Sequence, residues 1–263
     1  MRVNWTGCAF AGLTLLVSAT SAAAQTPFEW RGQLASGQAI EIKGINGPVR
    51  ATGTSSPDVE VKAIRSARRS NADDVRIEVV PHAGGITICA VYPTPPGSEP
   101  NRCEPGSGGR SNNRNNDTVV EFDVRVPNGV GFVGRTVNGT VSGDRLQGDA
   151  EGHTVNGSVQ LTTTGHALAS TVNGSVQATM NRTDWPDSAS FTTVNGSITL
   201  TLPSAFAADL RAEMHSGSLT SDFPVSITSS TESPRRLRGT IGSGGRPLNL
   251  TTVNGSIRLL KAP

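Results

Sequence analysis

The side chains that could perform catalysis are acids and histidines in the second half of the chain. Glycoside hydrolysis requires two carboxylates at a defined separation across the scissile bond. Here the acids lie in the connections between copies of a repeated motif and share no common position within it. They are Asp144, Asp149, Glu151, Asp184, Asp187, Asp209, Glu213 and Asp222. Because single acids occur readily on solvated surfaces, the pattern favours surface acids over a catalytic pair.

Three histidines, His153, His166 and His215, have serines nearby in the sequence. A Ser-His-acid triad is recognised by its geometry, and serine is abundant in this chain, so nearness in sequence is weak support for one. Calcium-binding β-rolls carry repeated aspartates, but no copy of the repeated motif has an acid at its turn. We therefore predict no catalytic residue, no cofactor and no metal ligand.

Two clusters of three arginines are candidates for contact with an anionic partner. They are Arg65/Arg68/Arg69 and Arg235/Arg236/Arg238. Each lies in a polar connection, where solvated side chains are the usual interpretation. For the second cluster we hypothesise contact with an anionic envelope polymer or lipid headgroups, through an attraction that salt would screen. The whole chain is nearly balanced, with 22 Lys and Arg against 21 Asp and Glu once Arg2 is set aside, which argues against nucleic acid as a partner.

The chain is organised by a repeated motif, Thr-Val-Asn-Gly-Ser/Thr-Val/Ile. Its copies begin at residues 136, 154, 171, 193 and 252, and a degenerate copy with Ser216 in place of Asn begins at Met214. The first four Asn-Gly steps are 18, 17 and 22 residues apart. A period of about 20 residues is typical of a repeat fold in which each unit buries its apolar face against its neighbours.

The repeat unit is predicted to be a β-strand. Val159 and Leu161 alternate with Gln160, as in a half-buried strand. Asn and Gly both tolerate positive φ, so each Asn-Gly step is either a hairpin turn or a solenoid corner. We favour the corner because the repeats are too short for two hairpin strands and a return strand. The fold class predicted is a single all-β domain over residues 25–263, a β-solenoid of short strands with strict repeats at 130–260.

The turn asparagines should fall into one column if the repeats stack in phase. They are Asn46, in an early relative of the motif, and Asn138, Asn156, Asn173, Asn195 and Asn254. Most also match the Asn-x-Ser/Thr sequon for glycosylation, but a side-chain hydrogen-bond ladder like that of stacked asparagines in cross-β structures is the favoured role. The terminal copy, residues 250–260, is expected to form the last rung, and because open solenoid ends invite edge pairing, we expect capping or self-association there.

The N-terminus and the cysteines indicate export. Residues 1–24 have the charge, apolar run and small-residue cleavage site of a secretory signal peptide, and no later stretch could span a bilayer. Cys89 and Cys103 would then form a disulfide, worth about 3 kcal/mol in the chain-entropy model. It would pin the first half of a Pro-, Gly- and Asn-rich insertion at about 93–117, whose second half is expected to be mobile.

A family resemblance follows from these segments. The head Gly44-Ile45-Asn46-Gly47, the segment from Val124 to Gly129 and the run of repeats resemble the bacterial putative-adhesin family of exported β-strand-repeat proteins, related to a group named for its Gly-Ile-Asn head. The resemblance implies a β-solenoid-like fold and an envelope or surface location, and it supplies no catalytic residues. The long Cys-containing insertion and Ser216 depart from the family pattern.

Together these features predict a non-catalytic scaffold or adhesin-like protein of the periplasm or cell surface that binds an envelope protein or a glycan. A carbohydrate-active enzyme on a β-solenoid and a component of an envelope-stress sensor are the alternatives. Trp30 and Trp185 could stack on sugars or act as partly buried caps.

Overall fold

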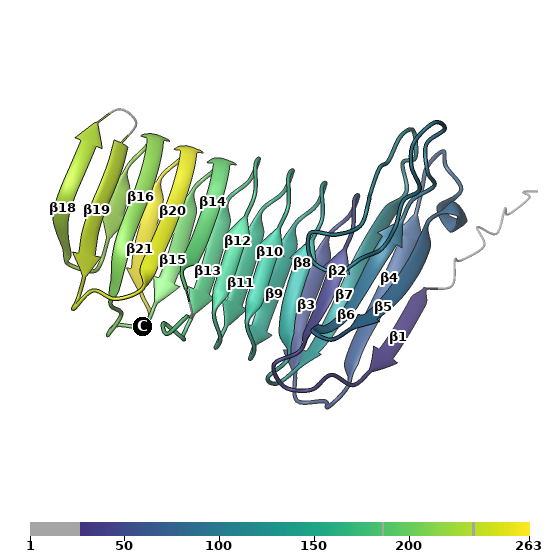
Figure 1. Cartoon of the computed structure of the whole chain (residues 1–263), viewed down its shortest axis with the longest axis horizontal. Helices are drawn as coiled ribbons and strands as arrows, with labels where there is room; N and C mark the ends of the chain where they lie inside the picture. The colour runs from purple at the N-terminus through teal and green to yellow at the C-terminus, as the bar shows by residue number, and fades with distance from the viewer. Residues whose placement is uncertain (1–26, 186, 233–234) are drawn as a thin grey trace, which may run out of the picture.

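The computed structural model describes residues 27–185, 187–232 and 235–263. The predicted signal peptide lies outside these residues. Within them the chain is a long stack of short strands in two facing sheets, with one 3-10 helix, η1, at Ala72–Asp74 (Figure 1). The predicted all-β, solenoid-like class is confirmed. No helix in the described ranges is long and apolar enough to cross a membrane.

Ten of the described strands form one sheet, called sheet A here, and eleven form the other, sheet B. In spatial order, sheet A contains β1 (Phe28–Gly32), β4 (Val59–Ser66), β7 (Val119–Pro127), β3 (Val49–Thr54), β9 (Val141–Leu146), β11 (Val159–Thr163), β13 (Val176–Met180), β15 (Ile198–Leu202), β21 (Ile257–Lys261) and β17 (Leu219–Ser221). Sheet B contains β18 (Val225–Glu232), β19 (Arg235–Ile241), β16 (Ala208–Ser216), β20 (Pro247–Asn254), β14 (Ala189–Asn195), β12 (Ala167–Ser170), β10 (Ala150–His153), β8 (Gly131–Arg135), β2 (Ala39–Lys43), β6 (Gly85–Val91) and β5 (Arg76–His82).

Each repeat forms one rung of the stack. A strand of sheet B leads through the Asn-Gly corner into a strand of sheet A, and equivalent strands of successive rungs pair in parallel. Val159 therefore lies beside Val141 on one side and Val176 on the other, and all three are fully buried. Alternation along each strand sends these side chains into a core one layer thick, which explains how a chain with 35% apolar residues fills it.

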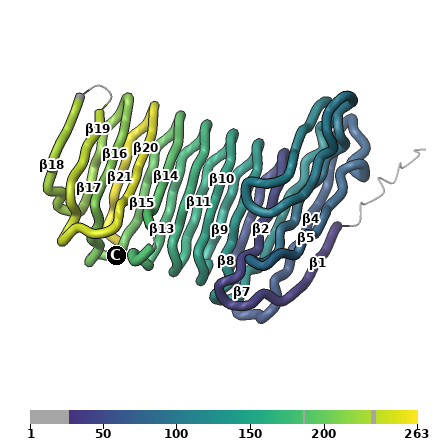
Figure 2. Tube along the Cα trace, viewed as in Figure 1, coloured from purple at the N-terminus to yellow at the C-terminus, as the bar shows by residue number. Residues whose placement is uncertain are grey.

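The last repeat is not the last rung. Strand β20 lies between β14 and β16, so the terminal copy is inserted before the degenerate one (Figure 2). The predicted position was wrong. In the observed order Ser216 ends the asparagine column, where its hydroxyl donates to Asn254 Oδ1 at 3.2 Å. A serine has one donor and no amide oxygen to offer a further rung, so it suits the end of the column better than its middle.

Both ends of the stack are extended by antiparallel strands. At the C-terminal end β19 pairs with β16 and β18 pairs with β19, which leaves sheet B longer than sheet A. At the N-terminal end β4 and β1 extend sheet A, and β5 extends sheet B. The edge strand β18 is largely exposed, with Ile227 at 59%.

The insertion is tied to sheet B by covalent and polar contacts. Cys89 in β6 and Cys103 form a disulfide with a Cα–Cα distance of 5.7 Å. Two backbone hydrogen bonds of 2.9 and 3.0 Å join Arg102 and Arg110. The Asn101 side chain is buried and donates to the carbonyls of Tyr92 and Asn112. Mobility of the second half of the insertion stays a prediction.

Tyr92, which precedes the insertion, is the single tyrosine of the chain and is only 2% exposed. Its hydroxyl donates to Thr118 O at 2.7 Å, so it joins the two ends of the insertion. Burial raises the pKa of Tyr92 to about 12, although hydrogen bonding with Asn46 opposes the shift. The neutral phenol is thus favoured in the folded protein.

We expect the free energy of unfolding to fall between about pH 10 and pH 12. Above pH 10 the unfolded chain loses the Tyr92 proton while the folded chain keeps it, so stability that is complete below pH 10 is lost, by up to roughly 3 kcal/mol. Urea unfolding across this range should show the loss, and Tyr92→Phe should remove it. Tyrosinate absorbance rising with a midpoint near 10 in the folded protein would contradict this prediction.

Candidate functional site

The predicted turn asparagines form a hydrogen-bonded ladder along the corners of the stack. Each Asn Nδ2 donates to the Oδ1 of its neighbour at 2.8–2.9 Å, through the column Asn46, Asn138, Asn156, Asn173, Asn195 and Asn254. All donate in one direction, toward Asn46, whose own Nδ2 donates to Thr118 O at 3.3 Å. The Thr side chains of the motif are buried and donate to glycine carbonyls of the adjacent rung at 2.7–3.0 Å.

The glycine of the motif is required for a reason other than the one expected. Among the motif glycines, positive φ occurs at Gly47 and Gly217, at the ends of the column, and the interior copies do not adopt it. A Cβ on Gly174 would instead lie 2.0 Å from Gly157 O and 2.5 Å from its carbonyl carbon. Tolerance of positive φ therefore does not explain the glycine of the interior rungs, where glycine is needed because two backbones approach closely.

Asn173→Ala is expected to lower the free energy of unfolding by about 1 kcal/mol, the usual size of one net hydrogen bond. Asn173 donates to Asn156 and accepts from Asn195, but its exposure lets water replace part of both bonds. Chemical denaturation of the variant and the parent would measure the difference. An unchanged midpoint would count against the ladder.

The arginines proposed as anion contacts lie in a strand, not in a connection. Arg235, Arg236 and Arg238 belong to β19. Arg236 pairs with Glu213 at 3.0 Å, and Arg235 Nη1 donates to Gly217 O at 3.3 Å. No ion pair of Arg238 occurs among the described residues. Arg65 of the other cluster is held by Val75 O and Asp73, so it is a structural contact of η1.

Sequence reasoning missed a buried carboxylate on sheet B. Glu41 in β2 is 5% exposed and accepts hydrogen bonds from Arg135 Nε at 2.8 Å, from Thr87 Oγ1 at 2.8 Å and from Gly106 N at 2.9 Å. A buried charge is tolerated when it is paired and hydrogen-bonded in this way. Glu41 therefore links the insertion to the sheet. In the sequence it is a single Glu in an alternating strand, a pattern that does not indicate burial or these partners.

Glu151, His153 and Ser170 meet on the outer face of sheet B. His153 Nδ1 lies 2.7 Å from Ser170 Oγ, and His153 Nε2 lies 3.4 Å from Glu151 Oε2. The hydrogen bond with His153, helped by nearby Arg135 and opposed by burial, lowers the pKa of Glu151. The backbone N–H of Thr171 beside Ser170 already donates to Thr192 O at 2.9 Å. That N–H is therefore not free to act as an oxyanion donor for Ser170.

Four of the remaining candidate acids and the second tryptophan have ordinary surface or core contacts. Asp149 and Asp184 contact His166, Glu213 contacts Arg236, and Asp144 contacts Arg145. Trp185 is 3% exposed and packs edge-on against His166 and beside Phe206. It is a buried cap rather than a platform for sugars. Within the described ranges no group of three His, Cys, Asp or Glu side chains could hold a metal ion.

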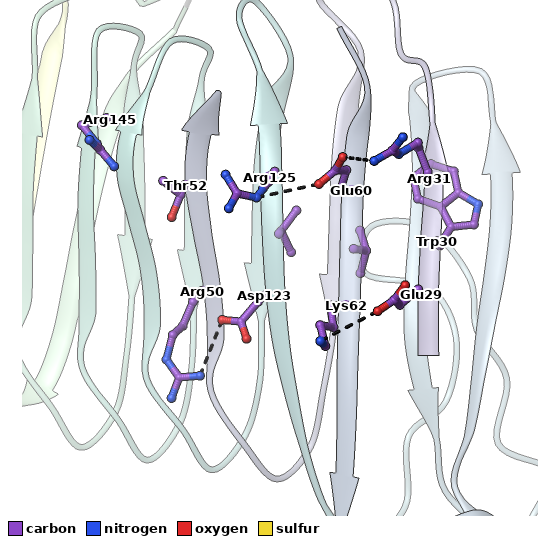
Figure 3. A pocket seen from close by; sticks show the side chains of 12 residues that line it. Glu29, Trp30, Arg31, Arg50, Thr52, Glu60, Lys62, Asp123, Arg125 and Arg145 are labelled. Carbon is purple, nitrogen blue, oxygen red and sulfur yellow. Dashed lines mark hydrogen bonds and ion pairs between the residues drawn. The ribbon is translucent and has the colours of Figure 1, made fainter. Parts of the chain in front are cut away.

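A hollow of about 700 Å³ lies on the outer face of sheet A at its N-terminal end (Figure 3). Two rows of side chains cross β1, β4, β7 and β3 here, and opposite charges alternate along each row. One row consists of Arg31, Glu60, Arg125 and Thr52, and the other consists of Glu29, Lys62, Asp123 and Arg50. We call this the charged hollow. Trp30, half-buried on the edge strand β1, also lines it.

The ion pairs of the charged hollow are exposed. Glu60 is shared by Arg31 and by Arg125, the latter at 3.7 Å; Arg50 lies 3.7 Å from Asp123, and Lys62 lies 3.8 Å from Glu29. Exposed pairs of this kind add little stability, roughly 0–1 kcal/mol. Five basic and three acidic side chains line the hollow, which leaves it net positive.

Arg145 reaches the rim of the charged hollow through a β-bulge. Strand β9 has one more residue than β11 between paired positions, since Gly143 pairs with Leu161 and Leu146 pairs with Thr163. The extra residue puts Arg145 at φ 50°, a left-handed conformation that costs a non-glycine residue about 1–2 kcal/mol. The 18-residue spacing from Asn138 to Asn156, against 17 for the next copy, is the trace of this bulge in the sequence.

The repeat region is similar to a known protein family. Residues 140–260 match the family model described as Toastrack DUF4097. The predicted family resemblance is confirmed. The Toastrack range runs from β9 into β21 and includes Arg145, whereas the other residues of the charged hollow precede it.

The solved structures that resemble this chain have low sequence identity to it. One similar structure is a putative cell adhesion protein of Clostridium sporogenes, 10% identical, with a TM-score of 0.35, covering 90% of this chain and 100% of that chain. Another is a putative adhesin of Bacteroides fragilis, 12% identical, with a TM-score of 0.35, covering 90% of this chain and 98% of that chain. Likeness at this TM-score carries no argument. No curated protein matches the chain.

Proposed function

We propose that the chain is a non-catalytic, exported scaffold of the periplasm or cell surface that binds a polar glycan in the charged hollow. The bulge at Arg145 carries this proposal. Strained residues and bulges that re-aim a side chain cluster at functional sites, and here the strained residue lines a surface hollow of about 700 Å³. The disulfide between Cys89 and Cys103 supports export, because such bonds persist in oxidising compartments.

The chemistry of the hollow suits a glycan. Sugar hydroxyls both donate and accept hydrogen bonds, and the rows present guanidinium donors beside carboxylate acceptors. The excess of basic groups around Arg125 and Arg145 favours a sugar that carries carboxylate groups, which arginine binds in a bidentate manner. The two rows stand on neighbouring paired strands, so their spacing is fixed before any partner binds.

The same contacts argue for binding without hydrolysis. A glycosidase needs one of its two carboxyl groups protonated to donate to the leaving oxygen. In the charged hollow Glu29, Glu60 and Asp123 each lie within 4 Å of a basic side chain, so none of them stands as an isolated carboxyl group. The hollow therefore offers paired acceptors and donors for binding.

A panel of immobilised neutral and acidic glycans would test this function. The parent chain should retain one or more acidic glycans, and Arg125→Gln/Arg145→Gln should lose at least about tenfold in affinity, the size of one or two charge-assisted hydrogen bonds. Arg114→Gln/Arg258→Gln removes the same charge at exposed sites elsewhere and should bind as the parent does. Retention of no glycan by the parent, or equal loss in both variants, would contradict the proposal.

A further inference from the structure

A second charged surface lies at the opposite end of the stack, on the outer face of sheet B. Strands β16 and β19 pair antiparallel, and the register places Arg211 directly opposite Arg238. Leu210 and Ala212, which flank Arg211 in β16, are buried, whereas Arg211 and Arg238 are both exposed. Both arginines therefore point outward. The next pair along, Glu213 and Arg236, forms an ion pair of 3.0 Å.

Arg211 and Arg238 form no ion pair among the described residues. Like charges directly opposite each other in an antiparallel pair destabilise a sheet. The residues that flank this pair in the same row are Asn249 in β20 and Ser229 in β18, which are neutral hydrogen-bonding groups. The fold therefore holds two guanidinium groups side by side at a local cost, and no acidic residue lies directly beside them in this row.

A shallow hollow of about 400 Å³ covers this row. Arg211, Arg236, Arg238, Glu213, Asn249 and Thr251 line it. We propose that Arg211 and Arg238, with Asn249 beside them, bind a phosphate group. Two adjacent guanidinium forks can share the oxygens of one phosphate, and an anion between them turns their repulsion into attraction. Glu213 is already occupied by Arg236 and sets one edge of the site.

The phosphate can come from a soluble phosphoester or from a lipid headgroup, and two measurements separate these sources. The first follows the arginine Nε–H signals of the ¹⁵N-labelled chain by NMR as inorganic phosphate replaces chloride at constant, low ionic strength. The second measures sedimentation of the chain with vesicles of phosphatidylglycerol or of phosphatidylcholine. We expect saturable shifts of two arginine signals, weakened by added salt because screening reduces the attraction.

Arg211→Gln/Arg238→Gln should reduce phosphate affinity at least about tenfold, while Arg114→Gln/Arg258→Gln should stay within about twofold of the parent. Sedimentation with phosphatidylglycerol alone, lost in the first variant, assigns the site to a lipid headgroup. A phosphate response without sedimentation assigns it to a soluble phosphoester. No phosphate response in the parent, or equal responses in the two variants, would overturn the proposal.

Arg238→Glu separates binding from folding. It places a carboxylate opposite Arg211, so the thermal midpoint should stay equal or rise while the phosphate response disappears. A variant that keeps the phosphate response would also overturn the proposed site.

Discussion

Gly174→Ala is expected to lower the free energy of unfolding by at least about 4 kcal/mol, above the usual 1–3 kcal/mol for overpacking. The added Cβ would lie 2.0 Å from Gly157 O and 2.9 Å from Ser158 N. Both atoms belong to the backbone of the neighbouring rung, which cannot move aside as a flexible side chain would. Relief requires the two rungs to separate, and this would weaken the Asn and Thr hydrogen bonds on either side of the corner.

Gly44→Ala provides the matched control. Its Cβ would meet Thr136 Oγ1 at 3.4 Å, an ordinary contact distance, and its backbone has no positive φ. We expect a change of less than about 1 kcal/mol for this variant. Urea denaturation followed by circular dichroism would compare the two. Equal midpoints for Gly174→Ala and Gly44→Ala would show that close approach does not explain the glycine of the motif.

Phe191→Ala is the core substitution with the largest expected effect, about 3–5 kcal/mol. Phe191 in β14 is fully buried, and its register partners are Ala169 in β12 and Leu250 in β20. Because the core is a single layer between two sheets, the cavity would extend across it and could close only if the sheets moved together. The variant would also weaken the contact of β14 with β20.

Leu260→Ala in β21 gives the comparison for Phe191→Ala. Its side chain is 36% exposed, so we expect a loss of less than about 1 kcal/mol. Differential scanning calorimetry of both variants would measure the two losses. A small loss at Phe191, comparable with that at Leu260, would mean that the stack is held together mainly by its backbone ladders and corners.

Much of the fold could be predicted because the spacing of the motif copies indicates how successive rungs align. The alternation around Val159 predicts strands, the motif spacing predicts rungs, and the asparagine column follows once the rungs are in phase. The Cys89–Cys103 disulfide could be predicted because these two cysteines, 14 residues apart, are the only ones after the predicted signal peptide.

The order of the final rungs could not be predicted in this way. Equivalent strands offer the same hydrogen bonds to any neighbour, so periodicity alone does not decide that β20 is inserted between β14 and β16. The chemical difference between Ser216 and Asn254 was the available signal. The reason for the glycines was also hidden, because positive φ and close approach both select glycine.

The candidate sites were less predictable than the fold. Arg145 is set by a bulge whose sole mark is one extra residue in the repeat spacing, and Glu41 looks like any acid in a strand until its three partners are known. The pairing of Arg211 with Arg238 joins residues 27 positions apart across the antiparallel pair of β16 and β19. Such cross-strand neighbours follow from topology, which the sequence pattern left open.

The most direct test of the proposed function is a calorimetric titration of three purified chains with the acidic glycan that the parent chain retains best. We expect Arg125→Gln/Arg145→Gln to weaken binding at least about tenfold and Arg211→Gln/Arg238→Gln to leave it within about twofold of the parent. Affinity that is unchanged in the first variant, or lost instead in the second, would contradict binding in the charged hollow.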